Sequence, residues 1–388
     1  MKRRLIFMCN AFDDMTRTAR GISTDSPAAS KKIIQLCKAL RLYDVKPIVL
    51  SMGRGGRTPE WKIYSSVVRR VDGITFIYIP FTTIPFLSQL LSIAGLVYVT
   101  MKLRFRGAKH LIFYNRSNAF LPSLLISTIL GYNNILDLED GEILVEKIIL
   151  SIKTNQIVVG LFDKLCDRAL LACSHLKERT SIRPVLCYYG TIFNLPAINK
   201  FQSKVVRVLI GGTLSHGTGA DLLIEAISQM RLTQDPWVKD IAFEVTGKGE
   251  SLDDFNLLAS LEGYPKIVVH GRLSDLDYRD VLNQADVGLS LKLNEGPFAN
   301  TTFPSKVIEY GAAGLLVLTT DISDVRSIFG DSAIYLKFDN PIELIDLLRI
   351  IVSNREEARA YSQNGFMAVK NIFMPHITGK MLADFIFE

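Results

Sequence analysis

The residues best suited to chemistry lie in one stretch, NTTFPSKVIEYGAAGLLVL, between Asn300 and Leu318. Polar residues are predicted to cap a helix that has Pro304 in its first turn, and a buried parallel strand is predicted to follow. A helix N-terminus offers free N–H groups to a phosphate. Lys306 adds a cation, and Glu309 adds a carboxylate that can accept hydrogen bonds from a diol. The pattern predicts a nucleotide-sugar site; the alternative is that Glu309 is an ordinary solvated helix residue.

This arrangement resembles the donor-binding motif of glycosyltransferase family 4, retaining enzymes with the GT-B fold, in its branch with FPSK followed by EY. In that family two glutamates lie eight positions apart. The second matches Glu309, whereas Thr301 stands at the position of the first. The resemblance implies that Glu309 holds the donor and that Lys306 stabilises the departing diphosphate. It adds donor contacts from the preceding turn: Thr302, Phe303, Pro304 and Ser305.

Two series of alternating strands and helices are expected to position this site. A chain of 388 residues is too long for one typical domain. The predicted class is α/β, with an N-terminal domain at 1–195, a C-terminal domain at 204–370 and a last helix at 371–388 that packs back on the first domain. The resemblance implies that both are Rossmann-like domains of a GT-B fold facing a central cleft. It assigns the acceptor to the first domain and the nucleotide sugar to the second.

A glycine-rich loop is predicted at 211–219, between the first strand and the first helix of the second domain. Glycine lets a backbone approach a pyrophosphate closely. The glycine order is not GxGxxG, and no acidic residue follows in the way a nicotinamide ribose needs. By the resemblance, this loop and the one that holds the base contribute further donor contacts: Gly212, Thr213, Thr218, Gly219, Arg272 and Leu273.

The same loop departs from the family in its charges. The family has an arginine and a lysine that neutralise the diphosphate, and Thr213 and Thr218 stand at their positions. A diphosphate leaving group needs local positive potential in a metal-free site. The cations that could replace them are Lys306, Arg272 and Lys248, with Lys306 preferred because it belongs to the donor motif.

An acidic cluster follows the strand predicted at 134–138, and its members are Asp137, Glu139, Asp140 and Glu142. Ligands of open α/β sheets bind at the carboxyl ends of strands. By the resemblance, Asp140 and then Glu139 are the candidates to contact the transferred sugar or the acceptor. The alternative is a solvated acidic loop that caps the next helix.

The first loop and helix of the chain face the acceptor in the resembling family. Ser26 and Pro27 are predicted to be the N-cap and first residue of that helix. The candidate acceptor contacts are Arg17, Arg20, Ser26 and Lys31. Each could equally be a surface residue or a cap.

Charge and hydropathy suggest a partner for the first domain. Residues 1–110 hold 19 Lys and Arg against 6 Asp and Glu, a net charge of +13, whereas the remainder holds 26 against 33, a net charge of −7. The apolar segment 86–101 is followed by Lys102, Arg104 and Arg106. It reads either as a core helix with a basic end or as an interfacial helix, and it is shorter than the ~20 residues that cross a bilayer. Interleaved aromatics of a nucleic-acid platform are missing, so anionic lipid or an anionic acceptor is the better partner.

Other chemistries are excluded. The five histidines share no metal spacing, HExxH and GxSxG are absent, and no cofactor or metal is expected beside the donor substrate. The five cysteines form no CxxC pair, which favours reduced thiols and the cytoplasm. We therefore expect a glycosyltransferase at the inner face of the cell membrane that uses a nucleoside-diphosphate sugar and a lipid-linked or glycan acceptor in bacterial cell-surface polysaccharide synthesis. The alternatives are a catalytically silent nucleotide-sugar-binding or scaffold protein, and another GT-B enzyme such as a nucleotide-sugar epimerase.

Overall fold

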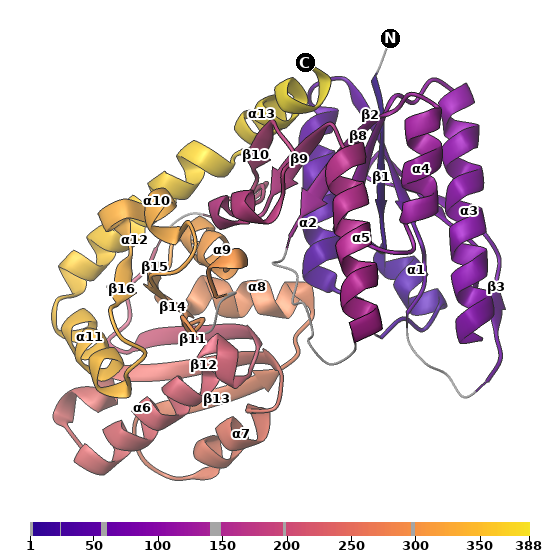
Figure 1. The fold of residues 1–388 in the computed structure, drawn as a ribbon. Coiled ribbons are helices and arrows are strands. Elements are labelled where there is room, and N and C mark those ends of the chain that lie inside the picture. The colour runs from indigo at the N-terminus through magenta and orange to yellow at the C-terminus, as the bar shows by residue number, and fades with distance from the viewer. Residues whose placement is uncertain (1–2, 24, 56–59, 140–148, 197–198, 296–298) are drawn as a thin grey trace. The chain divides into compact units, whose positions relative to one another are not determined.

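The computed structural model describes residues 3–23, 25–55, 60–139, 149–196, 199–295 and 299–388. The chain divides into two units (Figure 1). Unit 1 is formed by Met1–Thr191 and Pro375–Glu388, and unit 2 by Ile192–Met374. Each unit has its own hydrophobic core built around a mostly parallel sheet.

The sheet of unit 1 has the strand order β10-β9-β8-β7-β1-β2-β5-β4 in the described residues. All neighbours are parallel except β4 and β5, which are antiparallel. The order reverses between β1 and β7, and such a reversal opens a crevice at the carboxyl ends of the strands. The strands span Arg3–Cys9 (β1), Val45–Ser51 (β2), Val67–Val71 (β4), Ile74–Tyr78 (β5), His110–Tyr114 (β7), Asn133–Leu138 (β8), Arg168–Leu171 (β9) and Val185–Cys187 (β10), with β3 (Ile63–Tyr64) and β6 (Phe81–Thr82) as a separate pair.

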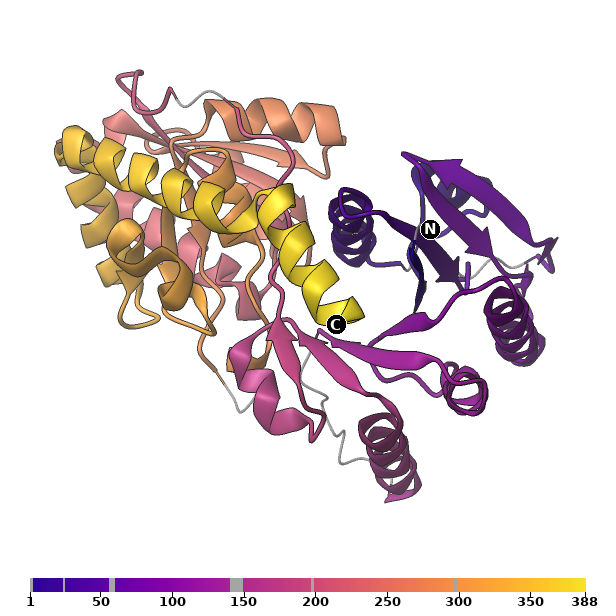
Figure 2. The same cartoon turned by 90° about the horizontal axis from the view of Figure 1, so that it is seen from above.

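Helices cover both faces of this sheet, with α3, α4 and α5 on one face and α2 and α13 on the other (Figure 2). Ser26 caps α2, its hydroxyl accepting from the Ala29 N–H, and Pro27 is the first helical residue, so this predicted start is confirmed. The helices span Asp14–Ala19 (α1), Pro27–Arg41 (α2), Pro85–Phe105 (α3), Leu121–Ile129 (α4), Ile149–Leu165 (α5) and Pro375–Phe387 (α13).

Helix α3 is longer than its apolar segment. It has 21 residues because the helix continues through Lys102 and Arg104, whose charges lie in its last turn. Residues Phe86–Phe105 are long and apolar enough to cross a membrane by length and composition alone, although 28% of that window is buried inside the protein. The apolar segment was therefore predicted too short, and the helix has the length that a membrane span requires.

The last helix also differs from the prediction. Instead of one helix at 371–388, the structure has α12 (Arg355–Phe373) and α13, separated at Met374. A residue before proline is driven out of the helical conformation, and Met374 is extended, with φ −64° and ψ 146°. Helix α13 then packs on α2, so closely that a β-carbon at Gly379 would lie 2.6 Å from the Ala39 carbonyl oxygen.

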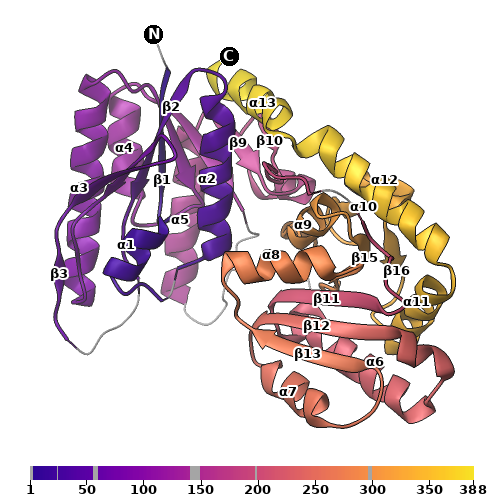
Figure 3. The same ribbon diagram turned by 180° about the vertical axis from the view of Figure 1, so that it is seen from behind.

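The sheet of unit 2 has the all-parallel order β13-β12-β11-β14-β15-β16 in the described residues (Figure 3). This is the doubly wound Rossmann order, which reverses between β11 and β14. The predicted α/β class with two Rossmann-like units is confirmed. The strands span Val206–Thr213 (β11), Ile241–Lys248 (β12), Lys266–Gly271 (β13), Val287–Ser290 (β14), Leu316–Thr320 (β15) and Ile334–Leu336 (β16).

Two predicted local boundaries in unit 2 are wrong. Gly211 and Gly212 lie inside β11, because they continue its pairing with Thr246 and Gly247 of β12. Pro304 precedes α9 and is not part of its first turn; the N-cap is Ser305. The helices span Ala220–Thr233 (α6), Leu252–Ser260 (α7), Asp275–Gln284 (α8), Lys306–Ala312 (α9), Val325–Phe329 (α10), Pro341–Ser353 (α11) and Arg355–Phe373 (α12).

Candidate functional site

Helix α9 is fixed by one apolar face and carries its charged groups on the other. Val307, Ile308 and Tyr310 are buried. The ring of Tyr310 fills the space above Gly288 of β14, where a β-carbon would lie 2.4 Å from it. The spacing of three residues between Lys306 and Glu309 then places both side chains together away from the core.

Lys306, Glu309 and Tyr278 form a compact polar cluster. Lys306 Nζ lies 2.5 Å from Glu309 Oε2 and 3.0 Å from the Tyr278 hydroxyl, which donates to the same Glu309 oxygen over 3.3 Å. The ammonium also lies 4.5 Å from the centre of the Tyr278 ring. Because the side chains of Lys306 and Glu309 are 32% and 22% exposed, a ligand can reach both.

The protonation states of this cluster are well defined. Burial opposes the charge of the Lys306 ammonium, but the Glu309 carboxylate outweighs that effect and raises the pKa of Lys306 above its ordinary value. Burial also raises the pKa of Tyr278, and the Glu309 charge adds to the rise. The cluster therefore presents an ammonium and a neutral phenol at physiological pH.

Three glycines line the sheet edge beside this cluster. A β-carbon at Gly212 would lie 3.7 Å from Lys306 Cε, and one at Gly211 would lie 2.8 Å from Thr246 Oγ1. Gly247 adopts φ 125°, and a β-carbon there would lie 1.9 Å from the Gly212 carbonyl oxygen. Gly211 and Gly247 therefore have no room for a side chain, and the backbone at Gly212 adjoins the Lys306 side chain.

The turn before α9 does not form the predicted polar cap. A 3₁₀ turn spans Ala299–Thr301, and Ser305 caps α9 without a side-chain hydrogen bond. Phe303 is buried and Ser305 is exposed. Lys292 donates to the Thr302 carbonyl over 3.4 Å, which places a second ammonium at this turn. Lys292 was missed because the sequence put it in a loop with no spacing to the donor motif.

The glycine-rich loop is held by its own contacts. The Thr218 hydroxyl donates within 2.9 Å to the Thr213 and Ser215 carbonyls and accepts from the Ser215 N–H, closing a capping box. Gly219 adopts φ 75°, and a β-carbon there would lie 2.2 Å from the Leu291 carbonyl. Thr218 and Gly219 therefore shape the loop, while the exposed Thr213 ends the strand beside it.

The other replacement cations follow neighbouring strands. Lys248 is the last residue of β12 and Arg272 directly follows β13, and both are exposed. Leu273 is half-buried. Among the described cations of unit 2, Lys306 is the one shown against the glycine edge of β11.

The acidic edge of unit 1 is only partly described. Asp140 and Glu142 lie outside the described residues. Glu139 forms an ion pair with Lys32 of α2, and its N–H donates to Asn115 Oδ1 over 2.7 Å. Lys32 was missed because it is 107 residues from Glu139 in sequence.

The predicted acceptor contacts have different surroundings. Arg20 is 4% exposed and donates to the backbone carbonyls of Gly53, Ser65 and Ile79. It stabilises the loop after β2, a role that its sequence context did not indicate. Arg17 pairs with Asp14 and Asp25, and the Ser26 hydroxyl accepts from the helix that it caps. Lys31 is exposed at the start of α2.

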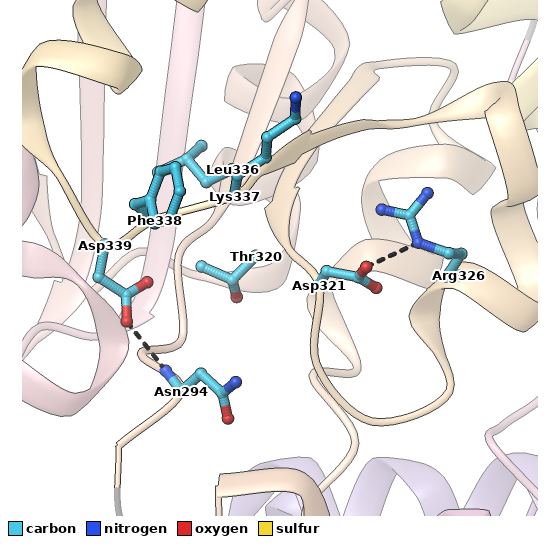
Figure 4. Close-up of a pocket in the computed structure, with 8 residues that line it drawn as sticks. All are labelled: Asn294, Thr320, Asp321, Arg326, Leu336, Lys337, Phe338 and Asp339. Atoms are coloured by element: carbon cyan, nitrogen blue, oxygen red, sulfur yellow. Dashed lines mark hydrogen bonds and ion pairs between the residues drawn. The ribbon is translucent and has the colours of Figure 1, made fainter.

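A separate pocket lies at the carboxyl ends of β15 and β16 (Figure 4). Arg326 donates to Asp321 over 2.7 Å, and the Asn294 N–H donates to Asp339 over 3.2 Å. Two basic and two acidic residues line the pocket, so it offers no excess of positive charge. Its lining is Asn294, Thr320, Asp321, Arg326, Leu336, Lys337, Phe338 and Asp339, none of which belongs to the predicted donor site. Within the described ranges, no group of three or more His, Cys, Asp or Glu side chains is arranged to hold a metal ion.

This chain is similar to known proteins in part of its sequence and in its fold. Residues 192–367 match the family described as glycosyl transferases group 1. A search of curated proteins found no match. Similar solved structures include HepE of Anabaena in complex with UDP and glucose (13% identity, TM-score 0.67, 98% of each chain covered). A glycosyltransferase from Rickettsia africae is also similar, with 15% identity, a TM-score of 0.67 and coverage of 99% of this chain and 98% of that chain. Sucrose-phosphate synthase from Thermosynechococcus elongatus has 11% identity, a TM-score of 0.69 and coverage of 98% of each chain. At these identities the likeness concerns the fold alone, and it confirms the predicted GT-B architecture.

Proposed function

We propose that this chain, a glycosyltransferase of the GT-B type, transfers a sugar from a nucleoside-diphosphate sugar to an acceptor hydroxyl with retention of configuration. The acceptor is a lipid-linked or glycan molecule of cell-surface polysaccharide synthesis, and the protein works at the inner face of the membrane. Retention and membership of the FPSK branch rest on the sequence resemblance.

One observation carries the donor assignment: the Lys306 ammonium contacts Glu309 and Tyr278, and the Lys306 side chain lies beside Gly212 of β11. A cation beside bare backbone suits a diphosphate. When the donor enters, its diol donates to Glu309, and Lys306 turns from Glu309 toward the phosphates. Negative charge that develops on the leaving diphosphate then meets an ammonium held in place before the reaction.

The neighbourhood supports specific roles for the surrounding residues. Tyr278 donates to Glu309 and orients its carboxylate, Lys292 brings a further ammonium to the Thr302 carbonyl, and Gly212 leaves room for the phosphates. A solved HepE structure contains UDP, so we infer that UDP is the first nucleotide to test. Glu139 and Asp140 remain the candidates for contact with the transferred sugar or the acceptor.

Thermal shift and transfer assays test this proposal. Ligands that bind only the native state raise its melting temperature. We expect UDP to raise Tm, GDP to raise it less, and released UDP to appear with a polyprenyl-linked acceptor. A protein that binds no nucleoside diphosphate would contradict the proposal. Binding without transfer to any lipid-linked or glycan acceptor would favour the catalytically silent alternative.

Support for the membrane location comes from the exposed side chains of α3. Its buried side carries the hydroxyl residues Ser92 and Thr100 together with Leu96 and Leu103. Large apolar side chains face outward: Phe86 is 73%, Leu90 49%, and Phe105 81% exposed. Such a surface is costly in water, whereas it suits the interface of a bilayer.

Basic residues adjoin this apolar surface. Lys102 and Arg106 are exposed at the carboxyl end of α3, and anionic lipid attracts each such charge by about 1 kcal/mol. We expect the protein to sediment with vesicles that contain phosphatidylglycerol, and Leu90→Glu with Phe105→Glu to abolish sedimentation. Leu232→Glu, which changes an 83% exposed leucine on α6, is the matched control. Equal binding by the α3 variant and the control would exclude α3 as the membrane contact.

A further inference from the structure

A second lysine–glutamate pair lies in unit 1, with a buried carboxyl group beside it. Lys32 pairs with Glu139, and its ammonium lies 5.2 Å from the centre of the Tyr188 ring. The side chains of Lys32 and Glu139 are 16% and 13% exposed. Asp137, the next-to-last residue of β8, is only 1% exposed, and neither of its carboxylate oxygens meets a donor among the described groups. This unpartnered acid requires an explanation.

The Asp137 carboxyl group faces that of Glu139, and two ionised carboxylates would both be acceptors with no proton to share. Burial raises the pKa of Asp137 well above its usual range, the Glu139 charge raises it further, and the Lys32 ammonium lowers it. The other titratable groups that face Asp137 are Cys9 and Tyr188, and burial raises the pKa of each. One proton on Asp137 turns the contact with Glu139 into a hydrogen bond.

We propose that Lys32 and Glu139 bind a hydroxyl group of the sugar acceptor. Asp137 is their positioning residue, because its protonated carboxyl group donates a hydrogen bond to Glu139. The proposal rests on the proposed function, since it names the acceptor chemistry of the same reaction. A carbohydrate hydroxyl both donates and accepts, so it can donate to Glu139 while accepting from Lys32. Asp137 is too buried to contact the acceptor itself, so its role is to orient the Glu139 carboxylate.

The place of the cluster supports this role. Glu139 follows β8 at the carboxyl edge of the sheet, where ligands of open α/β sheets bind. Its N–H donates to Asn115 Oδ1, and its carboxylate forms an ion pair with Lys32. A carboxylate fixed in this way is oriented before the acceptor arrives.

The first experiment needs no substrate. Asp137→Asn keeps the shape and removes the ionisation. In the unfolded chain Asp137 ionises near pH ~4, whereas the folded protein keeps the proton to higher pH. Its contribution to stability is therefore complete below pH ~4 and is lost as pH rises toward the folded pKa. We expect the Tm of Asp137→Asn to rise relative to wild type between pH 4 and 8. A Tm difference independent of pH would overturn the shared proton.

The second experiment measures transfer to a polyprenyl-linked acceptor with and without the lysine. Lys32→Met should raise the acceptor KM at least ~10-fold, as loss of a hydrogen bond to a charged group does, with the donor KM unchanged. Lys38→Met is the matched control, because it removes a more exposed ammonium of the same helix that pairs with Asp72. Asp137→Asn should also remove the alkaline fall in activity that ionised Asp137 causes beside Glu139.

These results separate the two proposals. A wild-type protein without transfer activity rejects the proposed function, while the pH dependence of Tm still decides whether Asp137 carries the proton. An active wild type whose Lys32→Met acceptor KM equals that of Lys38→Met overturns the hydroxyl site. If transfer activity falls at the same alkaline pH in wild type and in Asp137→Asn, the positioning role of Asp137 is overturned.

Discussion

Each unit of this chain places a lysine–glutamate pair beside the carboxyl edge of a Rossmann-like sheet, but the two pairs differ in origin and in exposure. Lys306 and Glu309 are three residues apart on one helix, with side chains 32% and 22% exposed. Lys32 and Glu139 are 107 residues apart, with side chains 16% and 13% exposed. The pair that is close in sequence, Lys306 and Glu309, is thus the more exposed one, and the pair that is distant in sequence, Lys32 and Glu139, is the more buried one.

The third member of each cluster differs as well. In unit 2 it is the Tyr278 phenol, which donates to Glu309, and in unit 1 it is the buried acid Asp137. A half-buried ammonium can turn toward a charged phosphate, because the phosphate replaces the carboxylate as its anionic partner. A confined ammonium keeps its carboxylate, because an unpaired buried charge is expensive. The difference therefore matches a charged donor to unit 2 and a neutral hydroxyl to unit 1.

The largest effect is expected for Lys306→Met, which removes the charge and retains the length of the side chain. Loss of one preorganised group that stabilises developing negative charge costs about 10²–10³-fold in kcat. We expect a fall of that size in sugar transfer, with melting temperature nearly unchanged. Steady-state transfer assays at saturating donor measure it.

The control for this variant is Lys239→Met, which removes an exposed ammonium elsewhere in unit 2. It should retain wild-type kcat. A Lys306→Met enzyme with kcat within a few-fold of the control would assign the diphosphate charge to Lys292, Lys248 or Arg272, and the contrast between the two pairs would disappear.

Glu309→Gln should have the next largest effect. The amide keeps an acceptor for one hydroxyl but loses the charge that strengthens bonds from a diol, a difference of about 1.5–3 kcal/mol for a charged hydrogen bond. We expect the Kd of UDP to rise about 10- to 100-fold by calorimetry. Asp346→Asn, which breaks an exposed pair at the same spacing with Arg349, should leave it unchanged. Unaltered UDP affinity in Glu309→Gln would return Glu309 to the role of a solvated helix residue.

The contrast between the pairs also explains how far the sequence could predict the site. Lys306 and Glu309 lie on one helical turn, so their spacing alone indicated that they meet. Lys32 and Asp137 act through tertiary contacts from α2 and β8, and no local pattern carries that information. For Arg20 the local context was misleading in another way. An arginine in a polar loop was predicted to contact the acceptor, yet Arg20 is 4% exposed and donates to backbone carbonyls.

The fold was more predictable than the site. Alternating apolar strands and capped helices indicated two series of β-α-β elements, because buried parallel strands form continuous apolar runs. The family resemblance implied that both series form Rossmann-like units. The boundaries failed where a tertiary contact overrode a local signal. Gly211 and Gly212 stay in β11 because β12 pairs with them, although glycine ordinarily favours a loop.

A smaller and more selective effect is expected when the two lysines are compared by thermal shift. Lys32→Met should show the wild-type rise in Tm with UDP, since Lys32 belongs to unit 1, whereas Lys306→Met should show little rise. The size of the rise follows the ratio of ligand concentration to Kd. Loss of the UDP shift in Lys32→Met would show that the unit 1 pair also serves the donor.

The smallest effect concerns a half-buried ionisable group of unit 1, His110, whose pH dependence is opposite in sign to that of Asp137. Burial lowers the pKa of His110 to about 4, and Arg168, Arg3 and Lys109 contribute to the lowering. The unfolded histidine binds a proton below its ordinary pKa of 6.5, so the stability that His110 contributes is complete above pH 6.5 and is lost as pH falls toward 4. The Asp137 contribution is lost in the other direction, as pH rises above ~4. Wild-type Tm can therefore be nearly flat between pH 4 and 6.5 while both groups titrate.

Two variants separate these opposing contributions. His110→Phe keeps a ring against Phe387, which His110 meets edge-on at 4.6 Å, and removes the titration. We expect its Tm relative to wild type to rise as pH falls from 6.5 to 4, while the Tm of Asp137→Asn relative to wild type rises as pH increases over the same range. Differential scanning fluorimetry at half-unit steps measures both. If the Tm of both variants relative to wild type changed in the same direction with pH, one of the two groups would not hold the protonation state that its surroundings impose. Asp137 would then behave as an ordinary carboxylate.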